Sequence, residues 1–154
     1  MSSTILLFHK DIFIPEGIKE VCKQLQKDLT SYTYSKHFRE HLENQKRENR
    51  SHLYLEDVVR ECVNSLKERP RQVFEVELTE EKSYSWKVTK YCCRIPYDDK
   101  QDLVVAIRPV YFNDTVVENK IVTAWMNQHD DSHYTLDESK YCSRPHWDAI
   151  NKYS

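Results

Sequence analysis

The run DLVVAIRPVYF, residues 102–112, is rich in valine, isoleucine and aromatic residues. Such residues favour the extended conformation, so this run predicts a central strand. Three further segments have the same character: QVFEVELT (72–79), SYSWKVTKYCCRI (83–95) and NKIVTAWMN (119–127). Because these segments follow one another along the chain, they predict an antiparallel meander of about four strands.

The first half of the chain has helical periodicity instead. Apolar residues recur every three or four positions in EGIKEVCKQLQKDL (16–29), YSKHFREHLENQKRENR (34–50) and LYLEDVVRECVNSLKERP (53–70). Helices first and strands second predict an α+β arrangement, with N-terminal helices packed on a C-terminal antiparallel sheet. The earlier run TILLF (4–8) is interpreted as an edge strand or as a segment that anchors the core.

The length of 154 residues suits one domain with one core. We expect a single domain over 1–154, with a helical part at about 16–69, a sheet part at about 72–127, and a C-terminal loop or short helix over 128–154. The sequence contains one glycine, Gly17, which excludes any mechanism that needs a Gly-rich phosphate loop.

The charge and cysteine content narrow the class of protein further. The net charge is −2, which does not mark the whole chain as a nucleic-acid binder, so local patches would have to hold phosphates. The five cysteines are an odd number with one adjacent pair, Cys92 and Cys93, which indicates reduced thiols in a cytoplasmic protein. No segment is long enough to span a membrane, so we expect no membrane partner.

Two histidines in the second predicted helix are candidate functional residues. His37 and His41 are four positions apart and therefore share one face. If Ser35 caps this helix, His37 lies in its first turn, where the helix dipole favours a neutral imidazole suited to a general base. The alternatives are two exposed polar residues on an amphipathic helix, or half of a zinc site whose third ligand is not evident in the sequence.

The last predicted strand carries an unusual set of polar and aromatic residues. Strict alternation places Val122, Ala124 and Met126 on one face, and Ile121, Thr123, Trp125 and Asn127 on the other. The second set would form the floor of a groove, in which Trp125 stacks a base while Thr123 and Asn127 donate to phosphate or sugar. The alternative is that threonine and tryptophan are simply good strand formers.

The turn after this strand holds two more candidates. TLDE, residues 135–138, matches a capping box, so His133 lies just before a helical turn and Tyr141 lies near the end of that turn. The alternative is that both residues decorate a loop.

Two arginines in the predicted sheet complete the candidate site. Arg94 follows the cysteine pair, and Arg108 lies in an apolar strand on the same face as Val104 and Ala106. An arginine inside a sheet needs a carboxylate or a bound anion as its partner. The alternative for Arg108 is a strand end pointing outward. We expect no metal and no other cofactor, because adjacent cysteines are poor chelators and no CxxC motif exists.

The order of these segments resembles the RelE-like branch of the barnase, colicin and RelE ribonuclease superfamily. The resemblance rests on YSKHFREHL (34–42), YLEDVVRECVNSL (54–66) and VTAW (122–125). It implies a toxin-like or phage-encoded domain with a functional histidine at the start of a helix and a threonine beside an aromatic residue in the last strand. Such domains often place an arginine shortly after the histidine, for which Arg39, Arg47 and Arg50 are candidates.

The residues and the resemblance together predict a metal-independent endoribonuclease that cleaves RNA by 2′-OH transesterification. The expected catalytic residues are His37, Arg94, Arg108, Thr123, His133 and Tyr141, and the expected RNA-binding residues are Arg39, His41, Trp125 and Asn127. A protein antitoxin or a host factor is a further possible partner. The competing hypothesis is a non-catalytic binding protein whose acidic second half, including Asp130 and Asp131, mimics nucleic acid and inhibits a host factor.

Overall fold

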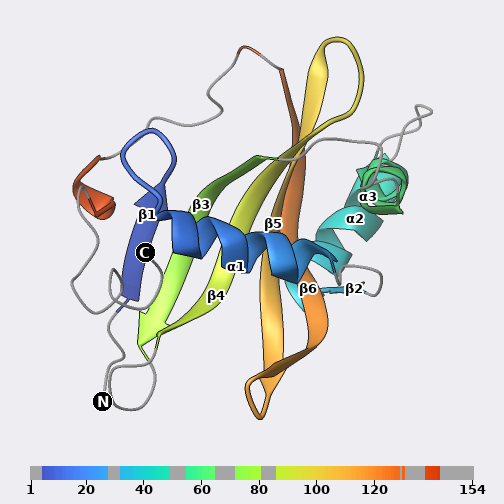
Figure 1. Ribbon diagram of the computed structural model, residues 1–154. Helices are drawn as coiled ribbons and strands as arrows, with labels where there is room; N and C mark the ends of the chain where they lie inside the picture. The colour runs from blue at the N-terminus through green and yellow to red at the C-terminus, as the bar shows by residue number, and fades with distance from the viewer. Residues whose placement is uncertain are drawn as a thin grey trace.

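The computed structural model describes residues 5–27, 32–48, 55–64, 72–80, 86–128, 130 and 138–142 (Figure 1). Their elements are, in chain order, β1 (Ile5–His9), α1 (Glu16–Lys27), β2 (Tyr32–Tyr34), α2 (Lys36–Glu48), α3 (Leu55–Asn64), β3 (Gln72–Glu80), β4 (Trp86–Pro96), β5 (Gln101–Phe112), β6 (Thr115–Gln128) and the 3₁₀ turn η1 (Glu138–Lys140). Within this part of the chain, no helix is long and apolar enough to cross a membrane.

One mixed sheet of six strands dominates the fold, in the order β1-β3-β4-β5-β6-β2. Strands β3 to β6 form consecutive antiparallel pairs, β1 adds antiparallel to β3, and β2 pairs with β6 in parallel. The prediction of N-terminal helices over a four-stranded antiparallel sheet is therefore wrong. Two N-terminal segments extend the sheet at its edges, because strand pairing joins segments far apart in sequence, which local periodicity cannot reveal.

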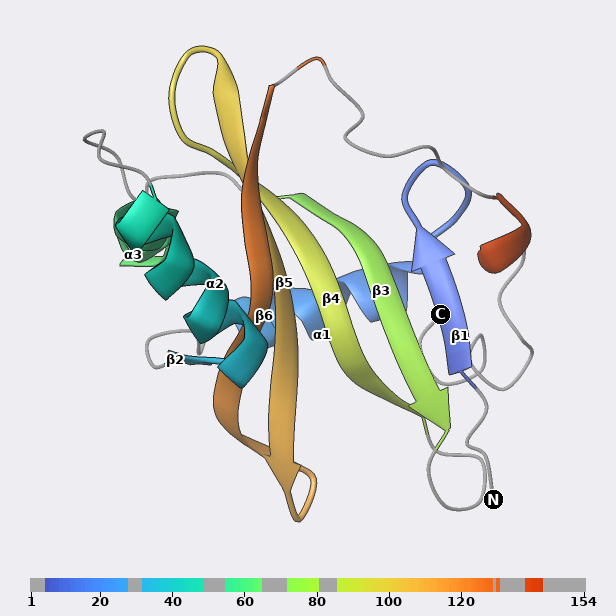
Figure 2. The ribbon, with the colours of Figure 1, turned by 180° about the vertical axis from the view of Figure 1, so that it is seen from behind.

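The three helices supply the main core from one side of the sheet. Helix α1 crosses in front of the sheet in Figure 1 and lies behind it in the reverse view of Figure 2. Helices α2 and α3 lie beside β6 in both views. Their buried side chains join the inner face of the sheet in one cluster, to which the helices contribute Ile18, Cys22, Phe38, Leu42, Leu55, Val58, Val59 and Cys62.

Local hydrogen bonds fix where α2 and α3 begin. The Ser35 hydroxyl accepts from the Phe38 amide at 3.2 Å, so Ser35 is the N-cap of α2 and His37 lies in the first turn. The same hydroxyl donates to the Val122 carbonyl at 3.1 Å, which attaches the start of α2 to β6. The Leu55 amide at the start of α3 donates to the side chain of Gln45 at 2.9 Å.

Bulges in the sheet change the faces on which some residues lie. The β5–β6 register shifts between the Ala106–Thr123 pair and the Ile107–Ile121 pair, which leaves Val122 as an extra residue. Consequently Ile121 packs in the core on the helix side, while Val122 packs with Trp125 on the other side. The prediction from strict alternation is wrong for these two residues, because alternation holds only where the ladder is regular.

We predict that β1 is an integral part of the core. Phe8 is 0% exposed, so Phe8→Ala should lower the free energy of unfolding by about 3–5 kcal/mol in equilibrium urea denaturation. Ile5 is the matched control in the same strand, because its side chain is 55% exposed and Ile5→Ala should cost far less. Equal losses in the two variants would contradict the placement of β1.

Candidate functional site

The side of the sheet opposite the helices carries an ordered array of polar and aromatic residues. We call it the helix-free face, because none of the described helices lies over it (Figure 2). Successive strand pairs place five of its residues in one row across β1, β3, β4, β5 and β6: His9, Glu75, Cys92, Ala106 and Thr123. The next row contains Arg94, Val104 and Trp125.

A small second apolar cluster occupies the middle of this face. It consists of Phe74, Cys92, Val104 and Ala106, and the half-buried side chains of Val122 and Trp125 pack against it. Val104 is 0% exposed, so its side chain at the centre of the face cannot contact a ligand in the folded chain. Groups that contact a ligand must therefore lie around this cluster.

The most concentrated group of ionisable side chains lies at the β1 end of the row. The Tyr141 hydroxyl donates to Glu75 Oε2 at 2.5 Å, and the Cys92 thiol donates to Glu75 Oε1 at 3.7 Å. The His9 ring makes edge contacts with the rings of Tyr141 and Phe74, at centroid distances of 5.3 and 5.9 Å. We call His9, Glu75, Cys92 and Tyr141 the Glu75 cluster.

The segment that carries Tyr141 is attached to the edge of the sheet. It follows η1, which lies beside β1 in both Figures 1 and 2. The Cys142 amide donates to the Leu7 carbonyl at 2.8 Å, on the outer edge of β1. Two independent hydrogen bonds, one from the backbone and one from the Tyr141 hydroxyl, therefore position the phenol over the sheet.

Burial sets the protonation states in the Glu75 cluster. His9 is buried, and burial lowers the pKa of its imidazole against the opposing effect of the Asp11 and Glu75 carboxylates. The Nδ1 atom of His9 accepts from the Asp11 amide at 3.1 Å, which leaves the proton of the neutral ring on Nε2. Burial, followed by the Glu75 charge, raises the pKa of the Cys92 thiol, so Cys92 is a neutral hydrogen-bond donor.

The two candidate arginines have different environments. Arg94 forms an ion pair with the buried carboxylate of Asp102 at 2.9 Å and donates to the Gln128 carbonyl at 3.1 Å. Its partner is thus an internal carboxylate. Arg108 is exposed, although it lies within β5 and not at a strand end.

The candidates on α2 lie apart from the Glu75 cluster. His37, Arg39 and His41 are exposed, and α2 begins beside β6, at the edge opposite β1. Four strand spacings of about 4.8 Å separate β1 from β6, so roughly 19 Å lie between these two strands. The structure therefore does not bring His37 and Tyr141 to one phosphate, whereas Arg94, Arg108, Thr123 and Trp125 share the helix-free face.

Of the remaining candidates from the sequence, one is buried and three lie outside the described residues. Asn127 is buried opposite Asp102, and its side chain accepts from the Gln128 amide at 3.1 Å. The three that lie outside are Arg50, Asp131 and His133. Within the described part of the chain, no group of three or more His, Cys, Asp or Glu side chains could hold a metal ion.

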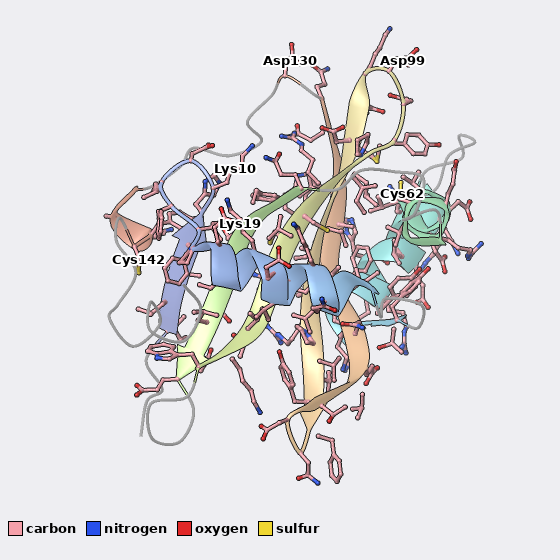
Figure 3. The ribbon with its side chains drawn as sticks, viewed as in Figure 1. Lys10, Lys19, Cys62, Asp99, Asp130 and Cys142 are labelled. Carbon is pink, nitrogen blue, oxygen red and sulfur yellow. The ribbon has the colours of Figure 1, made fainter. Side chains whose placement is uncertain are left out.

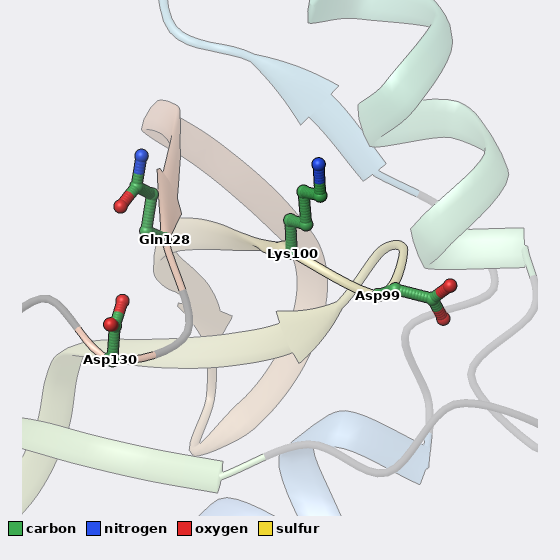
Figure 4. Close-up of a pocket in the computed structure, with 4 residues that line it drawn as sticks. All are labelled: Asp99, Lys100, Gln128 and Asp130. Carbon is green, nitrogen blue, oxygen red and sulfur yellow. The ribbon is translucent and has the colours of Figure 1, made fainter.

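A pocket of about 330 Å³ lies at the far end of the sheet, where β4 turns into β5 and β6 ends. Asp99, Lys100, Gln128 and Asp130 line it (Figure 4). Asp99 points away from the other three side chains, and Asp99 and Asp130 lie at the same end of the molecule (Figures 3 and 4). Two carboxylates, one ammonium and one amide make this a polar surface hollow without a catalytic arrangement.

Comparisons with known proteins do not assign the chain to a family. No family model matches it, and neither does any curated protein or solved structure. The function must therefore be argued from the residues themselves.

We predict that His9 makes the fold sensitive to mild acid. The folded-state pKa of His9 lies below its ordinary value of 6.5, so below pH 6.5 the unfolded chain takes up the proton first. The free energy of unfolding should fall on acidification by at most about 1.4 kcal/mol per pH unit. Urea denaturation at pH 7.5 and 5.5 should give a smaller decrease for His9→Gln than for wild type; identical decreases would contradict this role.

Proposed function

We propose that the protein is a metal-independent endoribonuclease that binds RNA on the helix-free face and uses Glu75 and Tyr141 for proton transfer. The observation that carries this proposal is the 2.5 Å hydrogen bond from the phenol to a carboxylate that lies in the same sheet row as Thr123. A carboxylate and a phenol in contact provide a base and an acid at one place. No other described pair among the candidates does so.

The reaction requires three functions, and residues of this face can supply each of them. The Glu75 carboxylate takes the proton of the ribose 2′-OH as that oxygen attacks the adjacent phosphorus. The P–O5′ bond breaks, and the Tyr141 hydroxyl gives its proton to the leaving 5′-oxygen. The products are a 2′,3′-cyclic phosphate and a 5′-hydroxyl, so atoms and protons balance without a metal.

A cation for the crowded phosphate lies beside the centre of the row. Lys90 lies two residues from Cys92 in β4, and Cys92 is opposite Glu75, whereas Arg94 on the other side of Cys92 is paired with Asp102. Two residues along a strand correspond to about 6.8 Å, which is within reach of long basic side chains. Trp125 lies three strands from Glu75 and would stack a base of a neighbouring nucleotide.

A cleavage assay tests the proposal. Total RNA in excess chelator should be cut by the wild-type protein, leaving 2′,3′-cyclic phosphate ends. Glu75→Gln and Tyr141→Phe should each lower the rate by about 10²–10⁴-fold, because each removes a proton-transfer group with little change of shape. Glu43→Gln makes the same chemical change at an exposed site on α2 and should cleave like wild type.

Two outcomes of this assay would contradict the proposal. Intact RNA in every lane, with circular dichroism showing folded protein, would rule out the ribonuclease. Cleavage that survives in Glu75→Gln and Tyr141→Phe but is lost in His37→Ala would transfer the reaction to α2.

The second candidate function is a binding protein that occupies a basic groove of a host factor. The observation in its favour is the group of exposed carboxylates on Asp98, Asp99 and Asp130 at one end of the sheet. Asp99→Lys with Asp130→Lys should then abolish capture of that factor from a host lysate, and Glu75→Gln should leave capture unchanged. If the variant with Asp99→Lys and Asp130→Lys captures the same proteins as wild type, the binding hypothesis fails.

A further inference from the structure

Three basic residues on the helix-free face lie side by side, and none of them forms an ion pair with another described residue. Arg108 on β5 is directly opposite Lys120 on β6. The β4–β5 pairing ends at Tyr91 opposite Ile107, and Lys90 and Arg108 are the next residues on these two strands. We call Lys90, Arg108 and Lys120 the cation row.

Like charges placed directly opposite one another destabilise a sheet. Glu77 on β3 is directly opposite Lys90 and lowers the repulsion at that end of the row. Arg108 and Lys120 are opposite each other, and the nearby Glu118 accepts a hydrogen bond from the Thr33 hydroxyl. Among the described residues, no ion pair involves a member of the cation row. Two directly opposed cations that form no ion pair there point to a bound anion.

The β4–β5 ladder ends beside the cation row. Pro109 follows Arg108 and has no N–H to donate to a neighbouring strand. Beyond this point β4 and β5 diverge in both views of the ribbon (Figures 1 and 2), and the Tyr111 hydroxyl connects them by donating to the Val88 carbonyl at 2.7 Å. Lys87 on the same part of β4 is already neutralised by Asp114 at 2.7 Å, so it is not part of the row.

An aromatic platform lies further along the same face. Trp125 is five residues beyond Lys120 on β6, and Thr123 lies between them. Five residues of strand span about 17 Å, which matches several nucleotides at the 3.4 Å charge spacing of a stacked strand. Cations followed by a half-exposed aromatic ring are the elements with which proteins bind single-stranded nucleic acid without sequence preference.

We propose that the cation row holds the phosphates at one end of a single-stranded nucleic acid whose chain runs along β6 from Lys120 to Trp125. This inference takes its ligand class from the proposed function, but it does not depend on cleavage. It assigns Lys120, extends the role of Lys90 from the reacting phosphate to its neighbours, and gives Arg108 a role in binding phosphate instead of acting on the reacting one.

Fluorescence anisotropy with a labelled 2′-O-methyl oligouridine tests the track, because this probe has no free 2′-OH and cannot be cleaved. The double variant Arg108→Gln, Lys120→Gln should bind at least tenfold more weakly than wild type. The slope of log K against log salt should become shallower by about 0.7 for each phosphate contact removed. Trp125→Ala should weaken binding of the oligouridine but not binding of heparin, a polyanion without bases.

The control variant removes the same charge from the other side of the sheet. Lys19→Gln with Lys23→Gln alters α1, where Lys19 pairs with the exposed Glu16 and Lys23 with the exposed Glu20. Lys19 is labelled on α1 in Figure 3. This variant should bind like wild type. Equal losses in the two double variants, or wild-type affinity in Arg108→Gln, Lys120→Gln, would overturn the proposal.

A stability measurement separates a ligand site from a fortuitous charge cluster. Lys120→Glu places a carboxylate opposite Arg108, so its unfolding midpoint should rise while its affinity for the oligouridine falls. A lower midpoint together with unchanged affinity would refute the track. If wild type binds the probe through the row but leaves cellular RNA intact, the track stands and the ribonuclease proposal fails.

Discussion

The constraint on which the structure depends is the burial of β5 on both of its faces. Six consecutive residues of this strand, from Asp102 to Ile107, are buried. The helices cover one face, but the described helices leave the other face open, so side chains from neighbouring strands must close it. Phe74, Cys92 and Trp125 do so, and they form the second cluster over Val104 and Ala106. The helix-free face consequently has a dry centre with polar groups around it.

This arrangement explains why the polar groups of the face are paired with one another. Asp102 is buried beside Val104, and a buried carboxylate without a partner would be costly, so Arg94 pairs with it. The Glu75 carboxylate likewise has partners, because it accepts hydrogen bonds from the Tyr141 hydroxyl and the Cys92 thiol. The cation row differs because its charges have no such partners among the described residues. That contrast within one sheet face is the strongest reason to look for a ligand there.

The sequence predicted the parts of the fold that depend on local patterning. The segments around β3 to β6 and the three helices have clear periodicity, and Ser35 was recognised as a possible cap for α2. The positions of β1 and β2 depend on pairing with distant strands, and the bulge at Val122 depends on the register of β5 with β6. The local pattern of TILLF (4–8) indicates an edge strand, as β1 is, but it does not show which strands β1 and β2 pair with or where the register shifts.

The candidate site was predicted less completely. Arg94, Arg108, Thr123 and Trp125 fall on one face, as alternation within their strands suggests. His9 and Glu75 were missed because each follows an apolar residue in a segment that looks structural. The alternation in QVFEVELT does place Glu75 and Glu77 on a common face, but only the tertiary contact with Tyr141 distinguishes Glu75. His37 was favoured for its position in the first turn of α2, a local signal that says nothing about distance from the other groups.

In the proposed complex, RNA occupies the helix-free face between the cation row and Trp125. A ¹H–¹⁵N NMR titration with 2′-O-methyl oligouridine tests it directly, because the indole N–H of Trp125 and the amides of β6 report on this face. The account predicts shifts for Trp125, Thr123 and Lys120, with the amides of α1 and the buried indole of Trp86 unchanged. Shifts confined to α2, or no shifts at saturating probe, would contradict it.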